Sequence, residues 1–455
     1  MKVMKKVIVL YVLIFGFQLQ AQFNALTYDF SGHAMVLNTN PGARTEYQSV
    51  FGIPAMSNFR FFAGNSGFSA YDLLAPDTSF NTKLEQILEN LDNTDNLLIN
   101  YRQDLINVVW PDLDGNLYQA GMYWELDYFN NFPADLLRLA YDGNASHLYE
   151  VYDMKYLAAK AEFVQTMYFG IQKNISRELK LGYRFKLYSG LANAQSTGNS
   201  GTYYTTDGTH NYYTHHLDDI NVDVKTSGYS ENGDRNYYLN KFLLSGNLGW
   251  GADLGFTYHP NEKTYFTASL LDLGFIYYSK DIQTYSLRGN YQYEGVPMEF
   301  PDEGTQDYWQ ILKDDFEANV YEEDGDDAYV SFRPLTLYTS VKFGTDNLRK
   351  VSCEDFVNPK TTYDNFVGFT GFAQLRPVKM HLGISAFYEK KWNKHLYTKF
   401  NLTADNYSYY SLGAGAVLNL GRLQVFMMVD NLAGLSDLAK SKKQAIQFGF
   451  NWIKF

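Results

Sequence analysis

One group of side chains in the sequence has the chemistry of a metal site: His215, His216, Asp218 and Asp219. Imidazole nitrogens and carboxylate oxygens are ligands that zinc accepts in a tetrahedral site. Adjacent side chains of an extended chain point in opposite directions, so one ion could not take all four. We therefore interpret these residues as a polar surface and predict no metal site there.

A second candidate is the acidic segment 322–327, where Asp and Glu side chains surround Gly325. Calcium prefers oxygen ligands, but the spacing differs from that of a calcium-binding loop. A solvated acidic loop is the simpler interpretation.

Catalytic and phosphate-binding patterns are also missing from the sequence. A barrel lipase needs Ser, His and an orienting polar residue together at the lipid-facing rim, which scattered histidines such as His33, His147 and His381 do not establish. The glycines over 246–251 lack the strand-to-helix context that a phosphate loop needs. The sequence therefore predicts no catalytic residue, no cofactor and no metal, and we expect that the protein is not an enzyme.

The N-terminus predicts export across the inner membrane. Three lysines in the first six residues precede an apolar run over 7–17, and Ala21 closes a cleavage pattern. We predict a signal peptide over 1–21, because the apolar run is too short for the alternative, a retained anchor helix.

The mature chain, 22–455, has the composition of a strand-rich protein. It contains many aromatic residues and glycines, with 39 Tyr, 33 Phe and 35 Gly in the whole sequence against 11 Pro, and aromatic residues favour strands. No later stretch of about 18 apolar residues is present, so only a barrel could cross a membrane. The net charge of −12 argues against a nucleic-acid partner. The single cysteine, Cys353, excludes an internal disulfide.

The segment 179–187 shows the pattern of a membrane-spanning strand. Every odd position is apolar, whereas Lys180, Arg184 and Lys186 share the other face. Cations that face lipid are costly, so these three are predicted to face the lumen. There they could attract an acidic head group or pair with inward carboxylates such as Glu389. The same reasoning predicts that Phe185→Arg impairs folding more than Arg184→Phe does.

Other segments repeat this alternation, and together they predict roughly 12 to 16 antiparallel strands. The regular ones lie at 335–343, 380–389 and 423–429, and less regular ones lie near 117–128, 163–175, 242–258, 264–273, 275–288, 366–376, 396–402 and 408–419. The sequence therefore predicts an all-β fold, a transmembrane antiparallel outer-membrane barrel.

Polar stretches and short links between the strands predict the two ends of the barrel. Long loops lie outside the cell and short turns in the periplasm. We expect extracellular loops at 193–240 and 289–330, and periplasmic turns at 176–178, 259–263 and 421–422.

The C-terminal strand carries the most specific signal of a barrel. An apolar face includes Phe448, Phe450 and Trp452, and the sequence ends at Phe455. This pattern resembles the signal recognised by the outer-membrane barrel assembly machinery, which we expect as a partner together with outer-membrane lipid. The alternative is a soluble sheet whose last strand has the same alternation.

Two helices are predicted before residue 150. Apolar residues over 84–91 have helical spacing after the capping residues 77–79, and a second helix is expected over 133–142. These pieces fit either an N-terminal hatch or periplasmic cap, or two surface helices. We expect the hatch-like region at about 22–115.

Three N-terminal runs resemble a Bacteroidota family of outer-membrane barrels of unknown function: 36–43, 51–58 and 64–68. More distantly, Asn40 and Pro41 are similar to the Asn-Pro-Ala motif of the long-chain fatty-acid transporter superfamily, which includes barrels attached to the type IX secretion system. Gly42 replaces the usual Ala. The resemblance implies a barrel of about 14 strands, with Asn40 and Pro41 in its hatch.

The resemblance implies two non-enzymatic functions in the outer membrane. The first is an accessory component of a cell-envelope complex such as the type IX secretion or gliding machinery, with secretion or motility proteins as partners. The alternative is a fatty-acid-transporter-like channel for small hydrophobic molecules. A channel predicts a lumen whose access a hatch controls, whereas an accessory role predicts a filled lumen and an exposed protein-binding face.

Overall fold

The computed structural model of the protein describes residues 25–209, 212–228, 245–294, 320–346 and 363–455. The predicted signal peptide over 1–21 lies outside the described residues, as do Cys353 and parts of both predicted loops.

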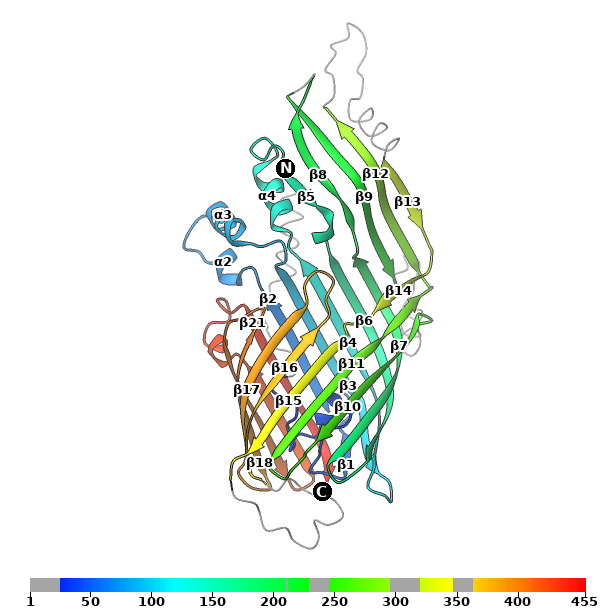
Figure 1. Cartoon of the computed structure of the whole chain (residues 1–455), viewed down its shortest axis with the longest axis vertical. Coiled ribbons are helices and arrows are strands. Elements are labelled where there is room, and N and C mark those ends of the chain that lie inside the picture. The colour runs from blue at the N-terminus through cyan, green and yellow to red at the C-terminus, as the bar shows by residue number, and fades with distance from the viewer. Residues whose placement is uncertain (1–24, 210–211, 229–244, 295–319, 347–362) are drawn as a thin grey trace.

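Antiparallel strands close into a 14-stranded barrel, which confirms the predicted fold class (Figure 1). The first wall strand consists of β1 (Ser49–Gly52) and β2 (Asn58–Asn65), which pair with β3 (Asn96–Pro111) on one side. On their other side they pair with the last strand, β21 (Lys443–Lys454), and this pairing closes the barrel.

The eighth wall strand is also made of two pieces, β14 (Tyr329–Phe332) and β15 (Thr336–Gly344), which both pair with β11. The remaining wall strands are single: β4 (Leu117–Asn131), β6 (Ala159–Asn174), β7 (Leu179–Ser196), β10 (Leu248–Tyr258), β11 (Thr264–Tyr278), β16 (Asn365–Gln374), β17 (His381–Lys391), β18 (Leu396–Asp405), β19 (Ser411–Leu420) and β20 (Leu423–Asp430).

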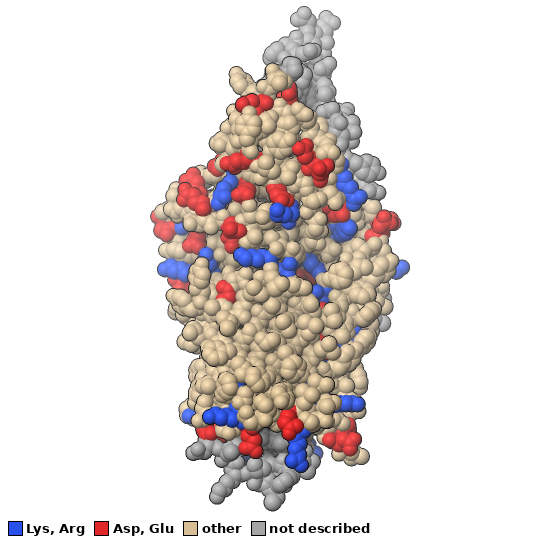
Figure 2. Space-filling model, in the orientation of Figure 1, with Lys and Arg blue, Asp and Glu red and all other residues tan. Residues whose placement is uncertain are grey.

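The wall strands expose apolar side chains outward and bury polar ones inside. In β7, Leu181 and Phe185 are each 43% exposed, whereas Arg184 is fully buried. Figure 2 shows the result on one face of the molecule as a belt of uncharged side chains in the lower half, with charged residues above and below it. Such a belt is typical of a barrel wall that faces lipid.

Five strands extend beyond the barrel at one end (Figure 1): β5 (Val151–Asp153), β8 (Ser200–Asp207), β9 (Tyr213–Ser227), β12 (Ile282–Tyr293) and β13 (Val320–Gly325). The two predicted loops therefore contain paired strands, since β8, β9 and β13 lie within them. These strands consist largely of polar and aromatic residues. Hydrogen bonds between neighbouring strands satisfy their backbone groups, so both faces of the sheet can stay polar. The short predicted turns lie at the opposite end, with the C-terminus.

Both predicted helices are present and lie outside the barrel (Figure 1). They are α3 (Phe80–Asn90), whose N-terminus is capped by the Ser79 side chain, and α4 (Ala134–Asp142). The sequence missed α2 (Ala70–Leu74), which has only one turn and a half. Since Ile87, Leu88, Leu91 and Ala134 pack together, these are surface helices rather than parts of a hatch. None of the described helices is long and apolar enough to span a membrane.

Candidate functional site: the plugged lumen

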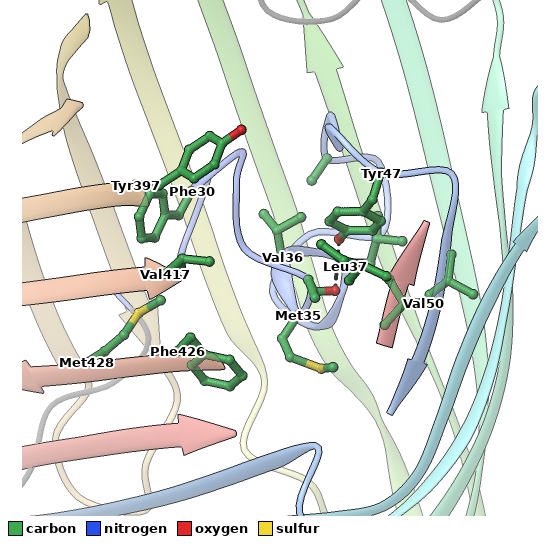
Figure 3. Packing of buried hydrophobic residues seen from close by; sticks show 14 of the residues in the cluster. Phe30, Met35, Val36, Leu37, Tyr47, Val50, Tyr397, Val417, Phe426 and Met428 are labelled. Carbon is green, nitrogen blue, oxygen red and sulfur yellow. Dashed lines mark hydrogen bonds between the residues drawn. The ribbon is translucent and has the colours of Figure 1, made fainter. Parts of the chain in front are cut away.

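The segment 25–48 lies inside the barrel as a plug (Figure 3). Around the short 3-10 helix η1 (Val36–Asn38), its apolar side chains pack against the inner wall. On the plug side the packed residues include Phe30, Met35, Val36, Leu37 and Tyr47, and on the wall side they include Val109, Leu117, Val417, Phe426 and Met428. The plug therefore fills the lumen at the end that carries the short turns.

The hatch-like region is shorter than the predicted range 22–115. After residue 48 the chain leaves the lumen and forms β1, β2 and β3, which belong to the wall. In β3, buried residues alternate with partly exposed ones, which is the pattern of a strand between lumen and lipid.

The predicted hatch motif anchors the plug to the wall. Asn40 Nδ2 donates to the Phe256 carbonyl at 3.1 Å, and Asn40 Oδ1 accepts from Gly42 N at 2.8 Å. Thr257 Oγ1 donates to the Gly42 carbonyl at 2.8 Å. Wall side chains thus bind the backbone of the motif, and the Asn40 side chain fixes its turn.

Two wall glycines make room for the motif. Gly182 of β7 pairs directly with Gly255 of β10. A Cβ atom on Gly182 would overlap with the backbone of Pro41, and one on Gly255 would overlap with the Asn40 side chain. The motif therefore packs on bare backbone, an approach that only glycine allows.

The three predicted lumen-facing cations have different environments. Arg184 Nε lies 2.6 Å from Asp253 Oδ2, and Lys186 Nζ lies 2.9 Å from Asp253 Oδ1 and 2.6 Å from Asp272 Oδ1. Lys180, at the end of the strand, forms no ion pair with the described residues. The alternative of pairing with inward carboxylates thus holds for two of the three cations.

Glu389, the carboxylate that the sequence suggested as a partner of these cations, contacts other residues. It accepts a hydrogen bond from Ser31 Oγ at 2.7 Å and lies 4.0 Å from Lys342 Nζ. Its strand, β17, lies on another side of the barrel from β7. The alternation of the sequence therefore predicted the side of the wall that Glu389 faces, but not the side chains that lie beside it.

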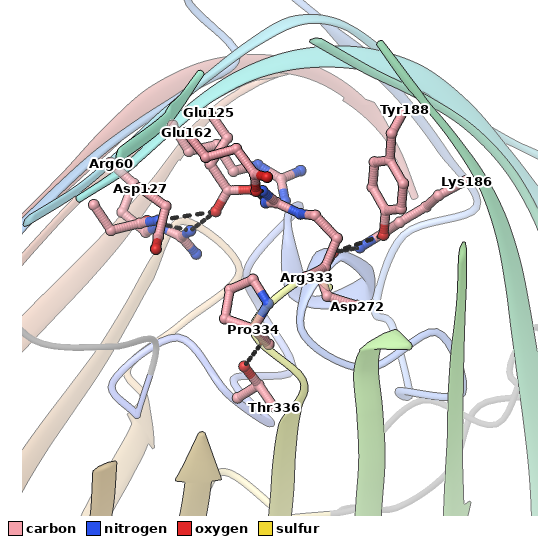
Figure 4. A network of polar contacts seen from close by, with 12 residues as sticks. Arg60, Glu125, Asp127, Glu162, Lys186, Tyr188, Asp272, Arg333, Pro334 and Thr336 are labelled. Carbon is pink, nitrogen blue, oxygen red and sulfur yellow. Dashed lines mark hydrogen bonds and ion pairs between the residues drawn. The ribbon is translucent and has the colours of Figure 1, made fainter. Parts of the chain in front are cut away.

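A network of ion pairs crosses the lumen above the plug (Figure 4). Between β14 and β15 the chain kinks inward at Arg333 and Pro334, where the strand is interrupted. Arg333 pairs with Glu162 on β6 and, at 2.6 Å, with Glu125 on β4. The side chain of Arg333 is completely buried.

A second arginine reaches the same part of the wall. Arg376, in the turn between β16 and β17, contacts both oxygens of Asp127 at 2.5 and 2.9 Å. Asp127 is on β4, the third wall strand, and the arginine follows the ninth, so the pair spans the barrel. Together with Arg333, it places charged groups that neutralise one another across the lumen.

The candidate metal ligands are not assembled into a site. His215 and His216 stack on different tyrosines, His215 on Tyr203 and Tyr293 and His216 on Tyr204, because adjacent positions of β9 face opposite sides. Within the described residues, no group of three or more His, Cys, Asp or Glu is placed to hold a metal ion. The side chains at 322–324 of the acidic segment lie outside the described part of the chain.

The predicted assembly signal lies on the outer face of the closing strand. Phe448, Trp452 and Phe455 are 36%, 53% and 42% exposed, and Phe450 is partly exposed on the same face of β21. This placement agrees with an apolar terminal strand that faces lipid. The recognition of the strand by the assembly machinery stays a prediction.

A family model of a protein family of unknown function, DUF5723, matches residues 41–430. The chain belongs to this family. A comparison of this DUF5723 member with curated proteins finds no match.

Several solved barrels resemble the DUF5723 member in outline. The toluene transporter TbuX of Ralstonia pickettii is 9% identical, with 96% of this chain and 99% of that chain covered and a TM-score of 0.43. A FadL homologue of Pseudomonas aeruginosa is 8% identical, with 96% and 97% covered and a TM-score of 0.43. The toluene transporter TodX of Pseudomonas putida is 9% identical, with 96% and 99% covered and a TM-score of 0.39. None of these similarities assigns a ligand to the DUF5723 member.

The sequence interpretation missed the cross-lumen network of the DUF5723 member, although part of its signal was present. Glu125 and Asp127 alternate with the outward residues Trp124 and Leu126, which is the criterion that placed the lumen cations. Pro334 interrupts a strand, as proline does at bulges and edges. These carboxylates pair with Arg333 only because the barrel closes, and no pattern of neighbouring residues in the sequence predicts that pairing.

Proposed function

We propose that this protein is an outer-membrane channel for small hydrophobic molecules, which the plug and the cross-lumen ion pairs hold closed. The observation that carries the proposal is a group of apolar wall residues that packs against the plug among the polar side chains of the inner wall, and it includes Val109, Val417 and Phe426. The interior of a porin is polar. A passage beside the apolar wall residues would favour apolar solutes once the plug moves.

The attachment of the plug is compatible with such a movement. Several wall side chains bind its backbone carbonyls, including Thr257 to Gly42 at 2.8 Å and Ser269 to Thr39 at 2.7 Å. Hydrogen bonds of this kind contribute about 1 kcal/mol each, because water can replace the lost partner. Two buried ion pairs, Asp29 with Lys342 and Glu46 with Lys391, also join plug and wall. The backbone ladder of the wall is independent of all these contacts, so the barrel can stay folded when the plug shifts.

The outer membrane is the location that fits this channel. The uncharged belt in Figure 2 matches a lipid-facing wall. We propose that the barrel assembly machinery recognises the terminal strand β21 and inserts the protein among outer-membrane lipids.

A second function is an accessory component of a cell-envelope complex such as the type IX secretion or gliding machinery. Two features favour it: the described lumen is filled, and the sheet of β8, β9 and β12 projects beyond the barrel as a surface for another protein. In this case the plug would stay in place permanently.

Uptake of a hydrophobic probe by intact cells separates the two functions. Cells that express the wild-type protein should take up N-phenyl-1-naphthylamine faster than cells without it. A variant with Thr257→Ala and Ser269→Ala, which loosens the plug, should be faster still. Thr339→Ala, an exposed threonine on the outer wall, serves as the matched control. Equal uptake in all four strains, with envelope proteins co-purifying in stoichiometric amounts, would reject the channel and support the accessory function.

A further inference from the structure

Three basic side chains meet at the seam between plug and wall. Arg44 belongs to the plug, Lys180 begins β7, and His259 lies in the turn between β10 and β11. Arg44 Nη2 donates to His259 Nε2 and, at 3.4 Å, to the carbonyl of Arg177. Lys180 pairs with Thr257 of β10, whose side chain binds the carbonyl of Gly42, two residues before Arg44, so the charges of Arg44 and Lys180 repel each other.

Arg44 is buried and Lys180 is partly exposed, and both differ from most buried cations of the lumen, which have carboxylate partners. Arg184, Lys186 and Arg333 each contact one or two carboxylates. Among the described residues, neither Arg44 nor Lys180 forms an ion pair. Arg44 is only 9% exposed, and its Nε has no hydrogen-bond partner.

Among the described carboxylates, Asp29 interacts electrostatically with Arg44, but it forms its ion pair with Lys342 at 3.1 Å and so does not neutralise the two cations. Glu178, the acidic residue of the adjacent turn, accepts from Ser176 Oγ at 2.9 Å and acts on His259 rather than on Lys180. Burial, helped by the charge of Arg44, lowers the pKa of His259 to about 4, so at neutral pH this ring is uncharged and accepts a hydrogen bond from Arg44. His259 therefore orients the guanidinium, and the local charge stays positive.

Physical chemistry favours an anion at this place. A buried cation without a counter-ion is unfavourable, and a second cation beside it adds repulsion. One oxyanion would relieve both effects and would give the Arg44 Nε a partner. A guanidinium is well suited to a carboxylate or phosphate, because its N–H groups match two oxygens at once.

We propose that Arg44 and Lys180 form a binding site for the oxyanion of a carboxylate or phosphate group, and that the bound anion locks the plug to the wall. Arg44 lies two residues beyond the docked motif, and Lys180 lies two residues before Gly182, the glycine on which the motif packs. An anion held by both side chains therefore joins plug and wall next to the anchor. The site is independent of what the channel transports.

Thermal unfolding of the full-length protein in maltoside micelles tests the site. Phosphate or acetate, compared with chloride at constant ionic strength, should raise the unfolding temperature with a saturating dependence on concentration, since a ligand of the folded state stabilises it. Lys180→Met should weaken the apparent phosphate affinity at least tenfold. Lys173→Met, an exposed lysine of the adjacent strand β6, should leave the affinity unchanged.

The variant carries its own control for folding. Because Lys180→Met removes a repulsion, it should unfold in chloride at the wild-type temperature or above it, so a lost response to phosphate would not reflect damage. If the rise in unfolding temperature saturates at a lower concentration of dihexanoyl phosphatidylglycerol than of inorganic phosphate, a lipid head group is the source of the anion. Equal concentrations would support a free anion. Unfolding temperatures that do not respond to any of these anions, or an unchanged phosphate response in Lys180→Met, would overturn the proposal.

Discussion

Replacement of Arg333 by methionine tests whether ion pairs close the lumen above the plug. Methionine keeps much of the apolar stem and removes the guanidinium, which contacts Glu162 and lies 2.6 Å from Glu125. The side chain of Arg333 is fully buried, so water does not replace the lost charge.

The loss can be estimated from the pairs that remain. Glu162 keeps Lys160 at 3.5 Å, and Glu125 keeps Arg60 at 3.7 Å, both longer than the contacts of Arg333. Removal of one partner of a buried ion pair costs about 3–5 kcal/mol. Since each carboxylate retains a second cation, we expect a loss near the lower end, about 3 kcal/mol.

Two measurements check this expectation. Denaturant unfolding in micelles should show the loss of stability, and planar-bilayer recordings should show a higher conductance than that of the wild type. Adding Glu162→Gln to Arg333→Met should recover part of the stability, because it removes one uncompensated charge. Arg288→Met is the matched control: Arg288 is 49% exposed in its pair with Asp223, and such surface pairs contribute about 0–1 kcal/mol.

The reasoning is refuted if Arg333→Met loses no more stability than Arg288→Met. It is also refuted if the double variant is less stable than the single one, because the remaining cations would then already balance the carboxylates. Unchanged conductance with the expected loss of stability would restrict the network to a structural role.

Three further predictions concern the plug, the wall and the closing strand. Gly182→Val should displace the docked motif and make the plug sensitive to added protease, whereas Gly371→Ala, on the outer wall, should not; equal protease resistance would contradict the docking model. Phe185→Arg should cost about 2–4 kcal/mol at the lipid face. Arg184→Phe should cost about 3 kcal/mol, because buried Asp253 loses one cation but keeps Lys186 at 2.9 Å. Unfolding titrations should therefore show similar losses rather than the ranking expected from sequence. Deletion of Phe455 should lower the amount of folded barrel in the membrane, measured by heat-modifiable gel mobility; unchanged levels would argue against an assembly signal.

Much of the barrel follows from short-range patterns. The two-residue alternation around Arg184 and Lys186 assigned both to the interior, because a strand places successive side chains on opposite faces. Capping and helical spacing predicted α3, and a first-turn proline with a terminating glycine predicted α4, for an equally local reason. The Asn40–Pro41 motif indicated a hatch through its resemblance to other barrels, although its extent up to residue 48 did not follow from it.

Contacts between distant segments were decided only by the tertiary structure. The alternation of the sequence places Glu125 and Glu389 inside the barrel. It cannot predict that Glu125 pairs with Arg333 or that Glu389 binds Ser31, because these neighbours depend on the order of the strands and the closure of the barrel. Lys180 and Lys186 also follow the same sequence pattern. Lys186 forms ion pairs with two carboxylates, whereas Lys180 is repelled by Arg44 of the plug. The sequence by itself determined which side of the wall each side chain faces, because that depends on adjacent residues. The charges that meet inside the lumen were decided by the folded chain, because Coulomb interactions depend on distance in space.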